Sequence, residues 1–305
     1  MDFTNCLQLF LKNCNAKNLS VNTIDGYRFN LKTFFDYCEK MGISDINKVN
    51  QYVVMDYFAS MKNKYSPCTI KDKFIVLKAF ITFLCNYGIM LVNPMENMKR
   101  PKIDKRIIYS FSKTDLQDIF SSFDKSDFIG FRNYTIMSVL FGTGMRKSEL
   151  LGINIFDIDL TSGVIKVMGK GNKERIVPIG ITLQKLIGKY IKARTNYLKE
   201  HKLGNNLKLF IGKNGEAFTI SGLNTVFNTL KANKAVWSTR VSAHTFRHTF
   251  AKYFLLNGGD LFSLQKILGH EDISTVKVYV ELNQNETKIQ NEKFNPLDNN
   301  RWQYY

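Results

Sequence analysis

Apolar residues recur at intervals of three or four through most of this sequence, and that spacing constrains the fold more than any other feature. It is the spacing of one face of an α-helix. In the first hundred residues it predicts four helices, over residues 3–11, 24–41, 54–61 and 70–84. Ser66 and Pro67 form a favourable entry to the last of these, because proline fits the first position of a helix. This part of the chain is expected to be a small four-helix domain.

One stretch of the second half departs from the helical spacing. Short runs rich in β-branched residues occur over 155–160, 164–168 and 175–178, and turn sequences separate them, which predicts a small three-stranded antiparallel sheet. Helices are predicted around it, over residues 112–120, 131–141, 183–198, 223–231, 243–256, 262–268 and 274–282. The predicted fold class is therefore mainly α, with a helical first domain and an α+β second domain.

A basic segment without an apolar stripe lies between these two patterns. Five of the eight residues over 99–106 are Lys or Arg, and one is Pro. Such a segment is typical of a linker. We expect a helical domain over 1–98, a basic linker over 99–109 and a second domain over 110–305. The polar, Asn-rich sequence from about residue 283 is expected to form a tail.

Charge limits the partners of this chain. The 43 Lys and Arg residues against 26 Asp and Glu give a net charge of +17, which favours binding to polyanions. Nucleic acid is the sharpest interpretation, since Lys and Arg contacts to phosphates supply most non-specific binding. A solvated basic surface and an anionic membrane surface remain alternatives. The most apolar stretch, 74–92, contains Lys78, Asn86 and Gly88, so no membrane span is expected and a cytoplasmic location is predicted.

Cysteines and carboxylates indicate neither disulfides nor a metal. The five cysteines are odd in number, lie in the first third of the chain and form no CxxC pair. We expect them to fill a core in a reducing compartment. No convincing cluster of Asp and Glu suggests a magnesium site. Neither a cofactor nor a metal is predicted.

The first motif with chemical promise is Gly142-Thr143-Gly144-Met145-Arg146-Lys147-Ser148-Glu149. An apolar helix is expected to end at the Gly-Thr-Gly turn, and a new helix to open with Arg146 in its first turn. A guanidinium at a helix N-terminus can hold two phosphate oxygens. Glu149, one turn later, is placed to fix the Arg146 side chain. The alternative is a surface arginine beside an ordinary helix start.

The second motif is the turn Gly169-Lys170-Gly171-Asn172-Lys173 between two predicted strands. A lysine on such a turn can reach a DNA groove and donate a proton. Lys170 is the first candidate, and Lys173 competes with it. The plainer interpretation is a hairpin turn with solvated lysines.

The third motif is His244-Thr245-Phe246-Arg247-His248 on a predicted helix. His244 and Arg247 are three residues apart and share a face, while Phe246 belongs to an apolar one. A histidine and an arginine within so apolar a helix indicate an anionic partner. The alternative is an ion pair with a carboxylate of the core.

The fourth motif is Leu268-Gly269-His270, followed nine residues later by Tyr279. Three of the four histidines of the chain lie in the third and fourth motifs, and the other, His201, is expected to be inert. Because the chain has 14 tyrosines, Tyr279 alone would be interpreted as packing.

In this order and spacing, the motifs resemble those of the tyrosine recombinase, or phage integrase, family. The resemblance covers nearly the whole chain, and its length and spacing are most similar to those of the Xer-type bacterial recombinases. It implies a SAM-like core-binding domain followed by a catalytic domain.

The resemblance also assigns roles to residues. Tyr279 would attack a DNA phosphate and form a 3′-phosphotyrosyl link, which conserves bond energy so that rejoining needs no ATP. Arg146 and Arg247 would bind the non-bridging oxygens of that phosphate, and His270 would add a hydrogen bond.

Two further residues complete the implied site. His244 would act near the tyrosine as an acid or base, or orient it. Lys170 would protonate the departing 5′ oxygen. No metal is implied.

The implied partner is double-stranded DNA with a short inverted-repeat core site, clamped between the two domains. Four identical protomers would assemble on two such sites, or a heterotetramer would form with a paralogue. Each protomer would pass its tail to a neighbour, and residues 294–297 would form an apolar plug. The DNA process could be integration, excision or resolution, for a chromosome, transposon, plasmid or phage.

Two other interpretations stay open. One is a related DNA-binding module that no longer cuts, and the other is a relaxing enzyme similar to the type IB topoisomerases. Covalent attachment to DNA separates the first from a recombinase, and site preference separates the second.

Overall fold

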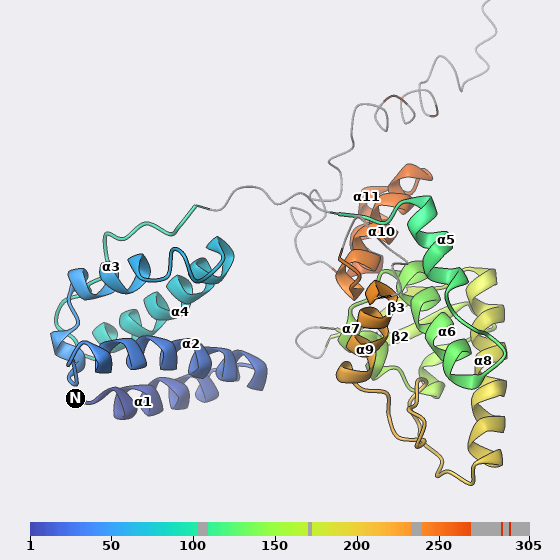
Figure 1. The fold of residues 1–305 in the computed structure, drawn as a ribbon, viewed down its shortest axis with the longest axis horizontal. Helices are drawn as coiled ribbons and strands as arrows, with labels where there is room; N and C mark the ends of the chain where they lie inside the picture. The colour runs from blue at the N-terminus through green and yellow to red at the C-terminus, as the bar shows by residue number, and fades with distance from the viewer. Residues whose placement is uncertain (103–108, 170–172, 233–239, 270–287, 289–292, 294–305) are drawn as a thin grey trace, which may run out of the picture. The chain divides into compact units, whose positions relative to one another are not determined.

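The computed structural model describes the whole chain except residues 103–108, 170–172, 233–239, 270–287, 289–292 and 294–305. The chain divides into two compact units, Met1–Arg106 and Ile107–Tyr305 (Figure 1). Residues 103–108 of the expected linker lie outside the described part, so the linker stays a prediction.

The first unit contains the four helices that the apolar spacing predicts. They are α1 (Phe3–Ala16), α2 (Val21–Lys40), α3 (Gln51–Ala59) and α4 (Pro67–Asn86), with a 3₁₀ turn, η1, over Ile46–Lys48. Each α-helix begins after a residue whose side chain accepts a hydrogen bond from a first-turn N–H, namely Asp2, Ser20, Asn50 and Ser66. These caps satisfy N–H groups that have no partner within the helix.

The core of this unit is rich in aromatic rings. Phe10 packs edge-on against Phe80, and Phe34 packs edge-on against Tyr57. Three of the cysteines, Cys6, Cys14 and Cys38, are buried in the same core, as predicted, whereas Cys68 and Cys85 are half-buried, and all five are free thiols. Burial raises the pKa of the Cys38 thiol to about 12, so it stays protonated.

The second unit surrounds its sheet with helices. Before the sheet come α5 (Lys113–Ser121), α6 (Phe128–Thr143) and α7 (Lys147–Gly152); after it come α8 (Ile181–Glu200), α9 (Ile220–Ala232), α10 (Ala243–Leu256) and α11 (Leu261–Leu268). The apolar helix α6 packs against both α8 and α10 and contributes Ile136, Met137 and Leu140 to the core (Figure 1). The helix predicted over 274–282 lies outside the described residues.

Within the described residues, the sheet is antiparallel and three-stranded, in the order β1 (Ile158–Asp159), β2 (Val164–Met168), β3 (Glu174–Pro178). This confirms the predicted sheet, and the mainly helical fold class is confirmed with it. Strands β2 and β3 pair from Val164 with Pro178 to Met168 with Glu174. At the base of their connecting turn, the Gly169 N–H donates to the Lys173 carbonyl at 2.8 Å.

The first predicted strand, 155–160, is only partly correct. Residues Ile155–Asp157 form a 3₁₀ turn, η2, and the strand has just two residues. The Asp157 carboxylate accepts a hydrogen bond from the Asn154 N–H at 2.7 Å, which closes the chain into a turn where the apolar run alone suggested extension. No helix in the described part of the chain is long and apolar enough to span a membrane.

Candidate active site

Two helices of the second unit end at glycines in the left-handed conformation, and these ends lie at the centre of the site. Gly144 ends α6 with φ of 61°, and Gly269 ends α11 with φ of 64°. A Cβ atom at Gly144 would lie 2.5 Å from a ring carbon of Phe250. A Cβ atom at Gly269 would lie 2.8 Å from Nη1 of Arg175. Both positions therefore need glycine for conformation and for space.

Arg146 is the residue that precedes α7, not a residue of its first turn as the sequence suggested. Its N–H donates to Glu149 Oε2 at 2.7 Å, and its Nη1 donates to Glu149 Oε1 at 2.8 Å. Glu149 thus closes the first turn of α7 and orients the arginine at the same time, as predicted. The Arg146 side chain is 31% exposed, whereas that of Glu149 is 2% exposed.

The Glu149 carboxylate also accepts a bidentate pair from Arg175 on β3. Arg175 Nη1 donates to Oε1 at 2.6 Å, and Nη2 donates to Oε2 at 2.9 Å. Burial acts to raise the pKa of Glu149, but hydrogen bonds and charge from Arg175 and Arg146 outweigh it, and the pKa is lowered. Glu149 is therefore a buried carboxylate held ionised between two arginines.

Arg247 lies on α10 and is 3% exposed. Its Nη1 donates to the Gly144 carbonyl at 2.9 Å, and its Nη2 donates to the Leu268 carbonyl at 2.8 Å. These two acceptors fix the guanidinium between the ends of α6 and α11. A helix C-terminus favours cations, because its last carbonyls have no partner within the helix.

The end of α11 holds all three arginines through consecutive carbonyls. Arg175 Nε donates to Ile267 O at 3.2 Å, Arg247 Nη2 donates to Leu268 O at 2.8 Å, and Arg146 Nη2 donates to Gly269 O at 3.4 Å. Segments more than a hundred residues apart in sequence thus meet at one helix end.

His244 lies one turn before Arg247 on α10. The residue is exposed, but its ring is partly shielded, and this loss of hydration is the first cause of a lowered pKa. The positive charges of Arg247, Lys147, Arg146 and Arg240 lower the pKa further. The imidazole is therefore mostly neutral at neutral pH and can accept a proton.

The structure brings together three of the six predicted site residues, Arg146, His244 and Arg247. The other three, Lys170, His270 and Tyr279, lie outside the described residues. The described residue that precedes Lys170 in the sequence is Gly169, at the base of the β2–β3 turn. The described residue that precedes His270 is Gly269, at the end of α11. The competing lysine, Lys173, is exposed at the base of the same turn.

Sequence reasoning missed Arg175. Its signal is the alternation of β3, since Arg175 stands two and four residues before the buried Val177 and Ile179. Side chains two apart share a face of a strand. An arginine on the buried face of a strand requires an anionic or carbonyl partner.

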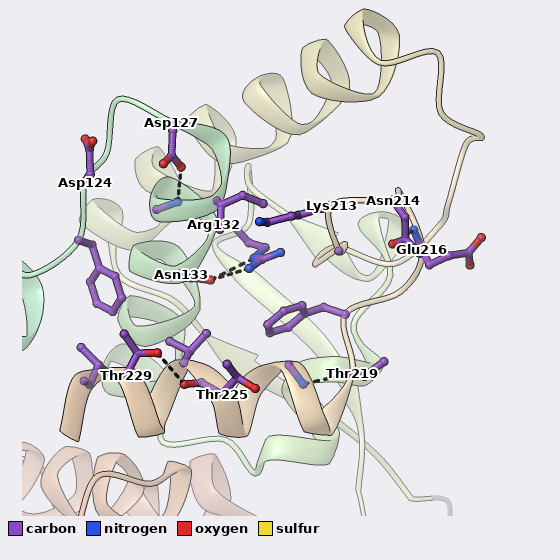
Figure 2. A pocket seen from close by; sticks show the side chains of 18 of the residues that line it. Asp124, Asp127, Arg132, Asn133, Lys213, Asn214, Glu216, Thr219, Thr225 and Thr229 are labelled. Atoms are coloured by element: carbon purple, nitrogen blue, oxygen red, sulfur yellow. Dashed lines mark hydrogen bonds between the residues drawn. The ribbon is translucent and has the colours of Figure 1, made fainter. Parts of the chain in front are cut away.

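A cavity of about 660 Å³ lies elsewhere in this unit, between the start of α6, the loop over 212–219 and α9 (Figure 2). Arg132 on its wall donates from Nε and Nη2 to Asn133 Oδ1, at 3.1 and 2.9 Å. Of the predicted site residues, the three that the structure describes, Arg146, His244 and Arg247, do not line this cavity. Among the described residues, no group of His, Cys, Asp and Glu could hold a metal ion.

Comparison with known proteins identifies the family. Residues 110–286 match the phage integrase family, and residues 7–88 match its N-terminal SAM-like domain. This chain belongs to the phage integrase family. Members of the family are tyrosine recombinases, which carry out site-specific recombination through a phosphotyrosyl intermediate, and the resemblance stated from the motifs is confirmed.

Curated relatives of this integrase-family chain are bacterial recombinases. The tyrosine recombinase XerD of Listeria monocytogenes serotype 4b (strain F2365) is 30% identical over 282 residues, which are 92% of this chain and 94% of the relative. The tyrosine recombinase XerC of Anoxybacillus flavithermus (strain DSM 21510 / WK1) is 32% identical over 278 residues, covering 90% of this chain and 92% of the relative.

A solved structure supports the integrase fold. The XerH site-specific recombinase, bound to a palindromic difH substrate after cleavage, matches with a TM-score of 0.73 and 20% identity. The match covers 94% of this chain and 83% of that one.

Proposed function

We propose that this chain is a site-specific recombinase that cleaves and rejoins DNA strands, with Tyr279 as the nucleophile. Family membership across both domains carries the proposal. The convergence of Arg146 and Arg247 on the end of α11 supports it, because two oriented guanidinium groups held at one place suit an anionic phosphate.

Arg146 and Arg247 would bind the two non-bridging oxygens of the phosphate under attack. Negative charge builds up on these oxygens as the tyrosine oxygen bonds to phosphorus. Fixed donors stabilise that charge without having to reorganise during the reaction. The same cations favour the phenolate of Tyr279, which otherwise has a pKa near ~10 and is a poor nucleophile at neutral pH.

Three other residues would transfer protons or donate a hydrogen bond to the phosphate. His244, mostly neutral because of its lowered pKa, suits removal of the tyrosine proton. Lys170 would protonate the 5′ oxygen as it leaves, and His270 would donate to the phosphate. The phosphotyrosyl bond keeps the energy of the broken phosphodiester, so the reverse attack by a 5′ hydroxyl rejoins the strand.

The partner proposed is double-stranded DNA with a short inverted-repeat core site. The net charge of +17 supports a polyanionic partner. We propose a tetramer on two sites, formed by identical chains or with a paralogue, and a cytoplasmic location. The proposed exchange of tails from about residue 283 predicts that truncation there weakens cooperative binding to paired sites, and unchanged cooperativity would contradict it.

Covalent trapping tests the function. Wild type and Tyr279→Phe are incubated with nicked DNA of the source genome, and SDS-resistant protein–DNA adducts are isolated and their attached ends sequenced. We expect adducts from wild type alone, focused on one short inverted repeat, while both proteins bind DNA equally.

Other outcomes separate the alternatives. An adduct in Tyr279→Phe would move the nucleophile to another residue. Adducts without sequence bias, together with relaxation of supercoiled DNA and no strand exchange, would favour a topoisomerase. Binding without any adduct would favour a module that no longer cuts.

A further inference from the structure

The carboxylate that orients Arg146 also offsets the positive charge of that arginine. Glu149 carries one negative charge and lies 2.8 Å from Nη1 of Arg146. With a 2% exposed side chain, the carboxylate is little screened by water, so the attraction is strong. Alone, this pair would be nearly neutral, and a neutral pair stabilises an incoming phosphate far less than a cation does.

Arg175 removes this conflict. Its guanidinium takes up both Glu149 oxygens, at 2.6 and 2.9 Å, so two positive charges share one negative charge. We infer that Arg175 is a positioning residue that lets Glu149 orient Arg146 while the site keeps a net positive charge for the phosphate. The inference rests on the proposed function and deepens it.

The guanidinium group of Arg175 also connects two elements of the site through hydrogen bonds. While Nη1 and Nη2 hold Glu149, Nε donates to the Ile267 carbonyl at 3.2 Å. Arg175 is the second residue of β3, close to the turn that carries Lys170, and Ile267 lies three residues before His270. One planar side chain therefore connects the base of the lysine turn with the end of α11.

The identity of the residue follows from this geometry. Three donors in a fixed plane meet two carboxylate oxygens and one carbonyl, which a lysine ammonium cannot reproduce. The fit is close, because a Cβ at Gly269 would lie 2.9 Å from Cδ of Arg175. A lysine at this position would keep the positive charge but could not make the three hydrogen bonds of Nε, Nη1 and Nη2.

A purely structural role makes a different prediction. If Arg175 only stabilised the fold, its loss would lower the melting temperature and leave the cleavage rate per folded molecule unchanged. Removing the Glu149 charge as well would then bring no recovery. If Arg175 offsets the charge of Glu149, removing that charge should restore part of the rate.

The experiment compares Arg175→Gln, Arg175→Lys, and Arg175→Gln combined with Glu149→Gln in the full-length chain. Single-turnover adduct formation is measured on a nicked recombination site at saturating DNA, together with DNA affinity and thermal unfolding. Lys166→Gln is the control, since Lys166 pairs with Glu174 on the exposed face of the same sheet. The control should cleave at the wild-type rate.

We expect Arg175→Gln to slow adduct formation about 100-fold, with DNA affinity changed less than about twofold. Arg175→Lys should slow it about tenfold, and the double variant should recover about tenfold relative to Arg175→Gln.

Wild-type rates in Arg175→Gln and Arg175→Lys would overturn the inference, as would a double variant no faster than Arg175→Gln. If Arg175→Gln does not fold, Arg175→Lys tests the inference by itself. A wild-type cleavage rate in Arg175→Lys would show that the three guanidinium hydrogen bonds of Arg175 are not needed. Absence of adducts in wild type would instead count against the proposed function.

Discussion

Arg132 and Arg247 are both buried on helices of the second unit, at 5% and 3% exposure, but their surroundings differ. Arg132 donates to its neighbour Asn133 (Figure 2). It also donates to the Ile211 carbonyl, and its guanidinium lies 4.2 Å from the centre of the Phe218 ring. Arg247 instead shares one helix end with two further arginines.

The difference separates packing from binding. Burial lowers the pKa of Arg132, and an amide oxygen, a carbonyl and an aromatic face compensate a single charge. At the end of α11, Arg247 is one of three guanidinium groups, and the Glu149 carboxylate accepts from the other two, Arg146 and Arg175. Such crowding of like charges is unfavourable without an anion, so it is expected where an anion binds. Replacing Arg247 should therefore lower the rate of DNA cleavage, whereas replacing Arg132 should lower the free energy of unfolding.

The largest effect is expected at Arg247. Arg247→Ala should slow adduct formation about 1,000-fold, or about 4 kcal/mol, because a charged donor to the developing negative charge is lost. Single-turnover cleavage at saturating DNA measures this effect. A rate near that of wild type would show that Arg247 does not take part in cleavage and that it does not differ in role from Arg132.

Arg132→Met should have the opposite profile. The change leaves the Ile211 carbonyl without its buried donor, and we expect the free energy of unfolding to fall by about 2–3 kcal/mol. Below the melting temperature, cleavage per folded molecule should match wild type. A large loss of cleavage without a loss of stability would show that the cavity beside Arg132 takes part in the reaction.

The smallest effect is a pH dependence at His248, which lies on α10 next to Arg247. Burial, followed by the charges of His244 and Arg247, lowers its pKa from 6.5 to about 4. Because the folded-state pKa is the lower one, the stabilising contribution of the neutral ring is complete above pH 6.5 and is lost as the pH falls toward 4.

This contribution should amount to about 1–2 kcal/mol after solvent screening is allowed for. Chemical unfolding of wild type and His248→Gln, measured between pH 7 and 4.5, tests it. The variant should show a shallower loss of stability, and parallel curves would show that the ring is not held neutral.

Local patterns predicted the helices and the hairpin because their causes are local. Ser66 caps α4 as its sequence context indicates, and the β-branched runs over 164–168 and 175–178 pair as the strands β2 and β3. The strand predicted over 155–160 is correct only for Ile158–Asp159, because the hydrogen bond from the Asn154 N–H to the Asp157 carboxylate favours a turn before it.

The site was predictable only in part. The link between Arg146 and Glu149 spans one helical turn, so residue spacing reveals it. Arg175 and Ile267 are 92 residues apart, and no local pattern shows that a strand arginine will meet the end of a distant helix. The roles of Lys170, His270 and Tyr279 stay predictions from the family resemblance.

Anchoring three arginines on backbone carbonyls has a consequence for how this chain can diverge over generations. A carbonyl oxygen is the same whatever residue carries it, so the anchors do not depend on which side chains stand at positions 267 and 268. Those positions can drift among apolar residues that fill the same space. Gly269 cannot, since any Cβ there would collide with Arg175. The geometry of the three arginines is thus inherited through the path of the backbone and one glycine.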